Sequence, residues 1–167
     1  MTCFRRIRRE TSGAAAAEMA LVLPLLMVVL FGSFEVGHFF YSAHIANKGV
    51  RDGARFAARQ SFNLLGCGPA VADGPTDIRI KEVTRTGQPS GGTPRISGWD
   101  NTEVTVTVTC TTTGSFATAG IYTGLTGGAR KVEVSAAVPY PSLFSLVGIN
   151  SSALTINARS EAAVMGI

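Results

Sequence analysis

Residues 61–167 of this 167-residue chain contain no histidine, because His38 and His44 both come earlier. The C-terminal part therefore lacks the commonest general base of enzymes. The chain has no Gly-x-Ser-x-Gly sequence, and its glycine-rich run 124–130 lacks the Gly-Lys-Ser/Thr ending of a phosphate loop. The two histidines do not share a helix face, and no cysteine or carboxylate cluster has metal-ligand spacing. We therefore expect no enzyme activity, no metal site and no cofactor.

The excess positive charge lies near the N-terminus. The formal net charge is +4, with eight Lys/Arg against four Asp/Glu in residues 1–60 and seven of each in residues 61–167. A nucleic-acid-binding domain needs a basic patch, but the largest Lys/Arg cluster of the second part is Arg130-Lys131. The sequence therefore argues against a nucleic-acid partner.

A long apolar run, residues 14–34, follows a leader with four arginines between residues 5 and 9. Glu18 is the only charged residue in the run. Its length is close to the roughly 20 residues that span a bilayer and exceeds the 7 to 15 of a secretory signal. We therefore favour a transmembrane helix over a cleaved signal or a buried core helix. By the positive-inside rule, the preceding arginines favour an N-terminus in the cytoplasm, and the rest of the chain is then expected to be exported.

The helical pattern continues beyond the apolar run. Small and apolar residues recur at three- and four-residue spacing from Ala43 to Ala58, which predicts an amphipathic helix to about Gln60. Aromatic residues 39–41 suit a membrane–water interface. Gly49 and Gly53 lie four residues apart, which permits either close approach of another element or a bend.

The remainder predicts a small antiparallel sheet and hence an α+β fold. Strand-like runs cover Ile78 to Val83, residues 103–109, residues 131–138 and a last run from Leu154 towards Ala162. Residues 69–77, 86–102 and 123–129 have the composition of loops. The apolar segment 139–149 is either a short helix over the sheet or a contact surface for lipid or a partner.

The three cysteines fall on two sides of the predicted membrane helix. Cys3 lies on the cytoplasmic side, whereas Cys67 and Cys110 lie in the exported part. In an oxidising compartment, such a pair is typical of a disulfide, here one that closes a loop of about 43 residues. The alternative is two free buried thiols.

Gly13, the four alanines after it and Glu18 resemble the processing site of a type IV prepilin-like protein, which is cut after the glycine. The resemblance extends along residues 14–26, 31–32, 35–37, 41 and 53–58, and more loosely along residues 134–161. These segments are similar to the TadE-like family of the tight-adherence (Flp) pilus machinery.

This resemblance implies a pilin-like minor pseudopilin that supports pilus assembly at the bacterial inner membrane. A prepilin peptidase would cut it between Gly13 and Ala14, and its partners would be the bilayer, other pilins or pseudopilins and the assembly platform. The chain would comprise a leader (1–13), a transmembrane helix (14–35), an amphipathic extension (36–60) and an exported β-rich domain (61–167). The alternative is an uncleaved, signal-anchored module that binds a cell-envelope ligand.

The two acids of the N-terminal segment have two interpretations each. Glu18 would pair with the new Ala14 amine of a neighbouring subunit, or would lie at the headgroup level near the helix N-terminus. Glu35 has a position like the family's second acid, or is an interfacial charge on the exported side. Met19 replaces the tyrosine usual in major pilins of the family, which indicates a minor component, and Pro24 predicts a kink or a weakened turn.

Overall fold

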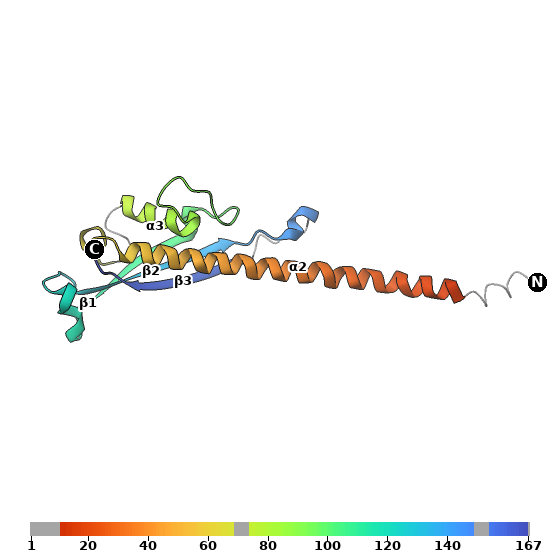
Figure 1. Ribbon diagram of the computed structural model, residues 1–167, viewed down its shortest axis with the longest axis horizontal. Helices are drawn as coiled ribbons and strands as arrows, with labels where there is room; N and C mark the ends of the chain where they lie inside the picture. The colour runs from red at the N-terminus through yellow and green to blue at the C-terminus, as the bar shows by residue number, and fades with distance from the viewer. Residues whose placement is uncertain (1–10, 69–73, 149–153, 167) are drawn as a thin grey trace, which may run out of the picture. The chain divides into compact units, whose positions relative to one another are not determined.

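The computed structural model describes residues 11–68, 74–148 and 154–166 (Figure 1). The chain divides into two compact units, residues 1–38 and residues 39–167. Helix α2 runs from Thr11 to Ala58 and includes Pro24. Its residues 11–38 form the described part of the first unit. Residues 39–58 of the same helix belong to the second unit. The helix therefore ends two residues before the predicted Gln60.

The second unit is an α+β domain, as the sequence predicts. Its sheet has three antiparallel strands in the order β1-β2-β3, namely β1 (Val104–Thr111), β2 (Ala129–Pro139) and β3 (Thr155–Ala163). Val106 lies opposite Val134, which in turn lies opposite Ser160. The other helical elements are α3 (Gly74–Thr86), η1 (Phe62–Leu64), η2 (Asn101–Glu103), η3 (Ser115–Thr118), η4 (Gly120–Tyr122) and η5 (Leu143–Val147).

Alternation of valine with polar residues places one face of the sheet in the core. Val104, Val106 and Val108 of β1 are buried, while the threonines between them lie on the other face. Strand β2 repeats the pattern through Val132, Val134, Ala136 and Val138. The predictions for residues 103–109, 131–138 and 154–162 are therefore confirmed, with β3 beginning at Thr155.

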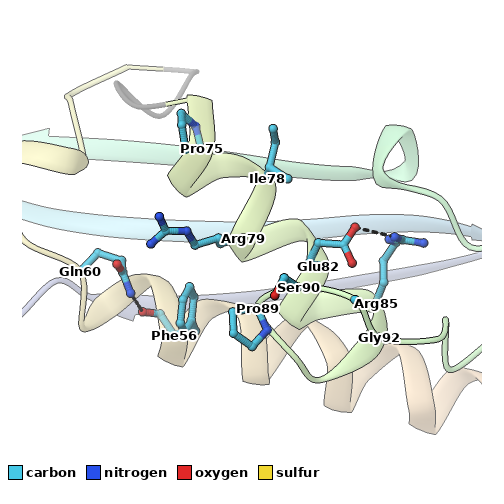
Figure 2. Close-up of a pocket in the computed structure, with 11 residues that line it drawn as sticks. Phe56, Gln60, Pro75, Ile78, Arg79, Glu82, Arg85, Pro89, Ser90 and Gly92 are labelled. Carbon is cyan, nitrogen blue, oxygen red and sulfur yellow. Dashed lines mark hydrogen bonds and ion pairs between the residues drawn. The ribbon is translucent and has the colours of Figure 1, made fainter.

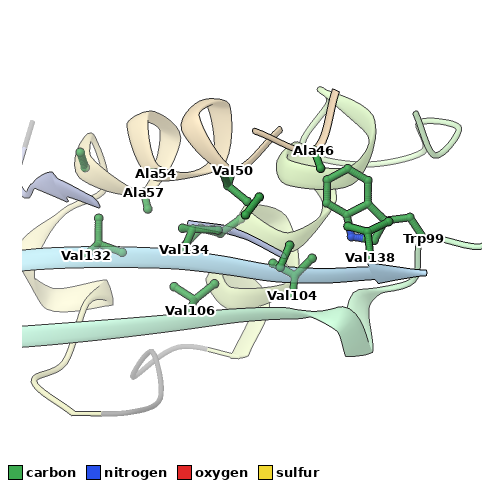
Figure 3. Packing of buried hydrophobic residues seen from close by; sticks show 14 of the residues in the cluster. Ala46, Val50, Ala54, Ala57, Trp99, Val104, Val106, Val132, Val134 and Val138 are labelled. Atoms are coloured by element: carbon green, nitrogen blue, oxygen red, sulfur yellow. The ribbon is translucent and has the colours of Figure 1, made fainter. Parts of the chain in front are cut away.

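Helix α2 packs on this apolar face through small side chains. Ala46, Val50, Ala54 and Ala57 are buried against the valines of β2, which they face in Figure 3. Because alanine adds little bulk, the helix backbone can approach the sheet closely. Helix α3 contacts β1. The core is therefore a layer of two helices on one side of the sheet.

Helix α3 corrects two predictions. Ile78, Ile80 and Val83 were expected in a strand and residues 69–77 in a loop, but α3 covers residues 74–86, and residues 69–73 lie outside the described ranges. The buried residues Thr76, Ile80, Val83 and Thr84 recur at helical spacing, whereas Ile78 is exposed. Thr76 and Thr84 count as polar in a sequence pattern, so their buried positions hid the helical period.

The predicted surface loop 86–102 is only partly a surface loop. Thr86 ends α3, and residues 87–100 contain no helix or strand, but Ile96 and Trp99 are buried in the core. Buried Arg85 holds it by donating to the Trp99 carbonyl (2.6 Å) and to Asn101 Oδ1 (2.8 Å). The glycine-rich composition thus permits the turns, while two large side chains and one arginine fix the path.

The segment after β2 contains a short helix, η5, with Leu143 42% exposed, and both interpretations of this segment, a helix over the sheet or a contact surface, stay predictions. Ser142 caps it by accepting a hydrogen bond from the Phe144 N–H. Tyr140 is buried, and its ring lies edge-on to Phe39, 5.2 Å between centroids. Ile149, which the prediction included, lies outside the described residues. The loop predicted at 123–129 ends where β2 begins at Ala129.

Candidate membrane anchor and processing segment

The first unit exposes an apolar surface on every side of its helix. Twelve large apolar side chains between Met19 and Phe34 are each at least 45% exposed, and Leu21 reaches 80%. Burying the exposed half of such a side chain contributes about 1 kcal/mol, so the twelve together give on the order of 10 kcal/mol. A helix that is apolar all round needs an apolar surrounding, which a bilayer or a bundle of partner helices supplies.

Within the described residues, one helix is long and apolar enough to cross a membrane. The candidate span covers Gly13–Ala58, and its most apolar stretch has no buried residue. A core helix of a soluble protein would instead be mostly buried. The structure therefore favours a single-pass anchor over the core-helix interpretation.

Gly13, Ala14 and Glu18 all lie in α2 and are exposed. A Cβ atom added to Gly13 would meet no heavy atom within 4 Å, so packing within the described residues does not require glycine there. Ala14 and Glu18 are four residues apart and so are neighbours on one helix face. An amine created at Ala14 would thus start on the face that carries the carboxylate.

Glu35 is partly buried and does not share a site with Glu18. The two acids are seventeen residues apart in α2, about 25 Å along a helix. Each therefore needs its own partner. Across the described ranges, no group of three or more His, Cys, Asp or Glu residues is placed to hold a metal ion, and this includes His38 and His44.

A disulfide joins Cys67 to Cys110, with 5.5 Å between their Cα atoms and a separation of 43 positions in sequence. Beside it, Gly68 and Val108 exchange two backbone hydrogen bonds, of 2.9 and 3.1 Å. The bond ties the segment that follows α2 to the edge strand β1. It gives the second unit a covalent cross-link close to the end of α2.

Arg130 is a structural residue that the sequence did not reveal. Its guanidinium donates to the carbonyls of Phe62, Leu65 (2.7 Å) and Thr126 (3.1 Å), and it lies 5.6 Å from the centre of the Phe62 ring. Arg130 lies at the start of β2 and donates hydrogen bonds to backbone carbonyls of the segment that follows α2. Phe62 and Leu65 lie 68 and 65 residues away in sequence, so no local pattern indicates these two partners.

These features define a protein with one candidate membrane helix and a small disulfide-closed α+β domain. Residues 13–55 match the family model described as TadE-like protein. The match confirms the predicted resemblance over the anchor and the first turns of the second unit. The looser resemblance of residues 134–161 stays a prediction. No curated protein and no solved structure matches the chain. The TadE-like match and the apolar helix together fit a membrane subunit associated with a pilus system.

Proposed function

We propose that this protein is a minor pseudopilin, a non-enzymatic subunit that supports assembly of a tight-adherence (Flp, type IVb) pilus. The observation that carries the proposal is the exposed apolar helix with Glu18 close to its start, inside the TadE-like match. Such a helix can rest in lipid before assembly and pack with other pilin helices afterwards, since both surroundings are apolar. The α+β domain then makes the exported contacts.

The proposal includes an inner-membrane location with the N-terminus in the cytoplasm. The four arginines between residues 5 and 9 favour retention of the leader on the cytoplasmic side. The chain would then divide into a leader (1–13), a membrane helix (14–35), a helix extension (36–60) and an exported domain (61–167). The disulfide agrees with this arrangement, because an oxidising compartment favours it.

Cleavage by a prepilin peptidase between Gly13 and Ala14 is the second part of the proposal. Gly13 has open surroundings, and residues 14–17 are alanines that leave the backbone accessible. Cutting there removes four arginines and creates an ammonium group at Ala14. The subunit would then be easier to draw out of the membrane, because its cytoplasmic charge is smaller.

In the assembled state, the Glu18 carboxylate would pair with the Ala14 ammonium of a neighbouring subunit. A charge in an apolar helix bundle is costly when it is unpaired, and an opposite charge beside it offsets part of that cost. Glu35, at the far end of the apolar run, would serve as a second charge contact. The competing function is an uncleaved, signal-anchored module that binds a cell-envelope ligand.

Intact-mass measurement of the membrane-extracted protein separates these functions. Expression beside a prepilin peptidase should give a chain that begins at Ala14, and expression without the peptidase should give the full chain. Gly13→Val should block cleavage, whereas Gly37→Val, at an equally open glycine, should not. A leader retained in the presence of an active peptidase would favour the signal-anchored module.

A further inference from the structure

A groove runs between the last turns of α2 and helix α3, entirely within the second unit. Its volume is about 1010 Å³, and residues 89–92 form part of its lining. Apolar groups form much of its lining, namely Phe56 of α2, Pro75 and Ile78 of α3, and Pro89 of the loop (Figure 2). Ile78 is 55% exposed although it is a large apolar side chain. The groove therefore offers an uncovered apolar wall.

Two charged residues that line the groove, Glu82 and Arg85, form an ion pair with each other. Glu82 Oε1 lies 2.7 Å from Arg85 Nη2 and accepts a second hydrogen bond from Asn101 (3.1 Å), as Figure 2 shows in part. Arg79 also lines the groove, is exposed, and forms no ion pair within the described residues. The groove thus carries one uncompensated positive charge beside its apolar wall.

More positive charge follows the α2 side of the groove. Exposed Arg55 of α2 and exposed Arg59, in the turn just after this helix, directly precede Phe56 and Gln60, which line the groove. The acid on this part of α2, Asp52, is already engaged by Arg95 at 2.9 Å.

Arg55, in the last turn of α2, and Arg59, in the turn that follows, are four residues apart and have no ion pair within the described residues. Like charges at such spacing destabilise a helix by about 0.2–0.5 kcal/mol per pair. A bound anion would remove that repulsion along the rim of the groove.

We propose that this groove binds an acidic peptide segment of a partner protein, with an apolar side chain against Ile78 and Phe56 and carboxylates on Arg79, Arg55 and Arg59. A small inorganic anion would leave the apolar wall uncovered. A lipid chain would place hydrocarbon against Arg79, Gln60 and Ser90, which line the same surface. The volume is at the upper end of the roughly 300–1,000 Å³ typical of small-molecule sites, which suits several residues of a peptide. This proposal goes beyond pilus assembly and does not depend on cleavage at Gly13.

The test uses the full chain in neutral maltoside micelles and fluorescence anisotropy. The probe is a fluorescein-labelled heptapeptide of alternating Glu and Leu, and the comparison peptide replaces each Glu by Lys. We expect saturable binding of the acidic peptide alone. Arg79→Glu should weaken it about tenfold, because a facing charge is reversed at the contact. The matched control is Lys48→Glu, which makes the same charge change on α2 at a residue that does not line the groove. It should change the affinity less than about twofold.

The apolar contact is tested separately with Ile78→Ser, which should weaken binding several-fold without changing charge. Both Ile78 and Arg79 are exposed, so these variants should keep the circular dichroism of the original protein. Equal losses for Arg79→Glu and Lys48→Glu would mean general charge attraction and would overturn the proposal. So would unchanged affinity in Ile78→Ser, absence of saturable peptide binding, or displacement of the peptide by phosphatidylglycerol micelles at lower concentration than by unlabelled peptide.

Discussion

Gly53 of α2 lies against Thr84 of α3 so closely that a Cβ atom on Gly53 would overlap the Thr84 hydroxyl oxygen. Gly49, one turn earlier, meets the same residue, since its Cβ would lie 2.5 Å from the Thr84 carbonyl oxygen and 2.8 Å from Cη2 of Trp99. The two glycines therefore set the distance between the helices. Of the two explanations that the sequence offered for them, close approach is the one the structure shows.

Gly53→Ala should destabilise the domain. Overpacking a close contact costs about 1–3 kcal/mol, and the higher helix propensity of alanine returns about 1 kcal/mol, so we expect a net loss of up to about 2 kcal/mol. Thermal or denaturant unfolding in micelles measures it.

Two further variants test the cause. Gly37→Ala, at a position with nothing within 4 Å, should cause no loss. Combining Gly53→Ala with Thr84→Ala should recover part of the stability, because the overlapping oxygen is gone. A double variant as unstable as the sum of the single ones would show that the contact is not the cause.

The disulfide should contribute strongly to the stability of the domain. In the chain-entropy model, a closed loop of 43 residues contributes about 4 kcal/mol. The variant in which Cys67→Ser and Cys110→Ser are combined should therefore unfold at a much lower denaturant concentration. A reducing agent should lower the midpoint of the original protein and leave that of the variant unchanged. Equal midpoints for the oxidised protein and the variant would contradict this role.

The β-strands and the long helix could be predicted because each repeats one local pattern. Val104, Val106 and Val108 alternate with threonines, and the alanines from 43 to 58 follow the helical period. Helix α3 could not, because two of its buried positions are threonines, Thr76 and Thr84, and Thr84 is packed against Gly49 and Gly53 of α2. The apolar residues that remained, Ile78, Ile80 and Val83, fit a short strand equally well.

The polar residues that organise the domain were out of reach for a different reason. Arg85 is buried, yet its acceptors at Trp99 and Asn101 follow in a glycine-rich segment that has no regular period. The groove between α2 and α3 requires α3 to be a helix, so it could not be predicted either. In the anchor, by contrast, composition alone determines the environment, since every face is apolar.

The Glu82–Arg85 pair should make stability depend on pH in the acidic range. The Arg85 guanidinium, by its hydrogen bond, holds the pKa of the Glu82 carboxyl below its ordinary value, and Asn101 acts in the same direction. A lowered folded-state pKa means that the contribution is present above the ordinary pKa near 4.5 and is lost as pH falls through the folded-state value.

Glu82→Gln should therefore cost stability at neutral pH, by about 1–3 kcal/mol for a weakened bond to a charged, buried Arg85. The difference between the two proteins should shrink as pH falls below about 4.5, the ordinary pKa of that acid. Denaturant unfolding at several pH values measures it. A difference that stays constant down to pH values near 3 would contradict a role for the charge.

Cys3 offers a test of orientation and processing in one reaction. With Cys67 and Cys110 in a disulfide, Cys3 is the remaining cysteine of the three, and the proposed cleavage removes it with the leader. A membrane-impermeant maleimide should label the uncleaved chain in inverted inner-membrane vesicles and not in intact spheroplasts. The mature chain should remain unlabelled under both conditions until the disulfide is reduced. Labelling in spheroplasts would reverse the proposed orientation.

Glu18→Gln should separate membrane insertion from assembly. The substitution keeps the size of the side chain and removes its charge, so insertion and cleavage at Gly13 should continue, because neither step needs the pair. Assembly should fall by about tenfold or more, since an Ala14 ammonium left unpaired in an apolar bundle is strongly unfavourable. Sheared surface pili, quantified against the membrane-bound subunit, measure the effect. Glu35→Gln, measured in parallel, tests the second acid. A loss of pili would indicate a charge contact, whereas normal pili would indicate an interfacial charge. Normal pilus levels in Glu18→Gln would leave Glu18 as a headgroup-level residue favoured by the helix N-terminus.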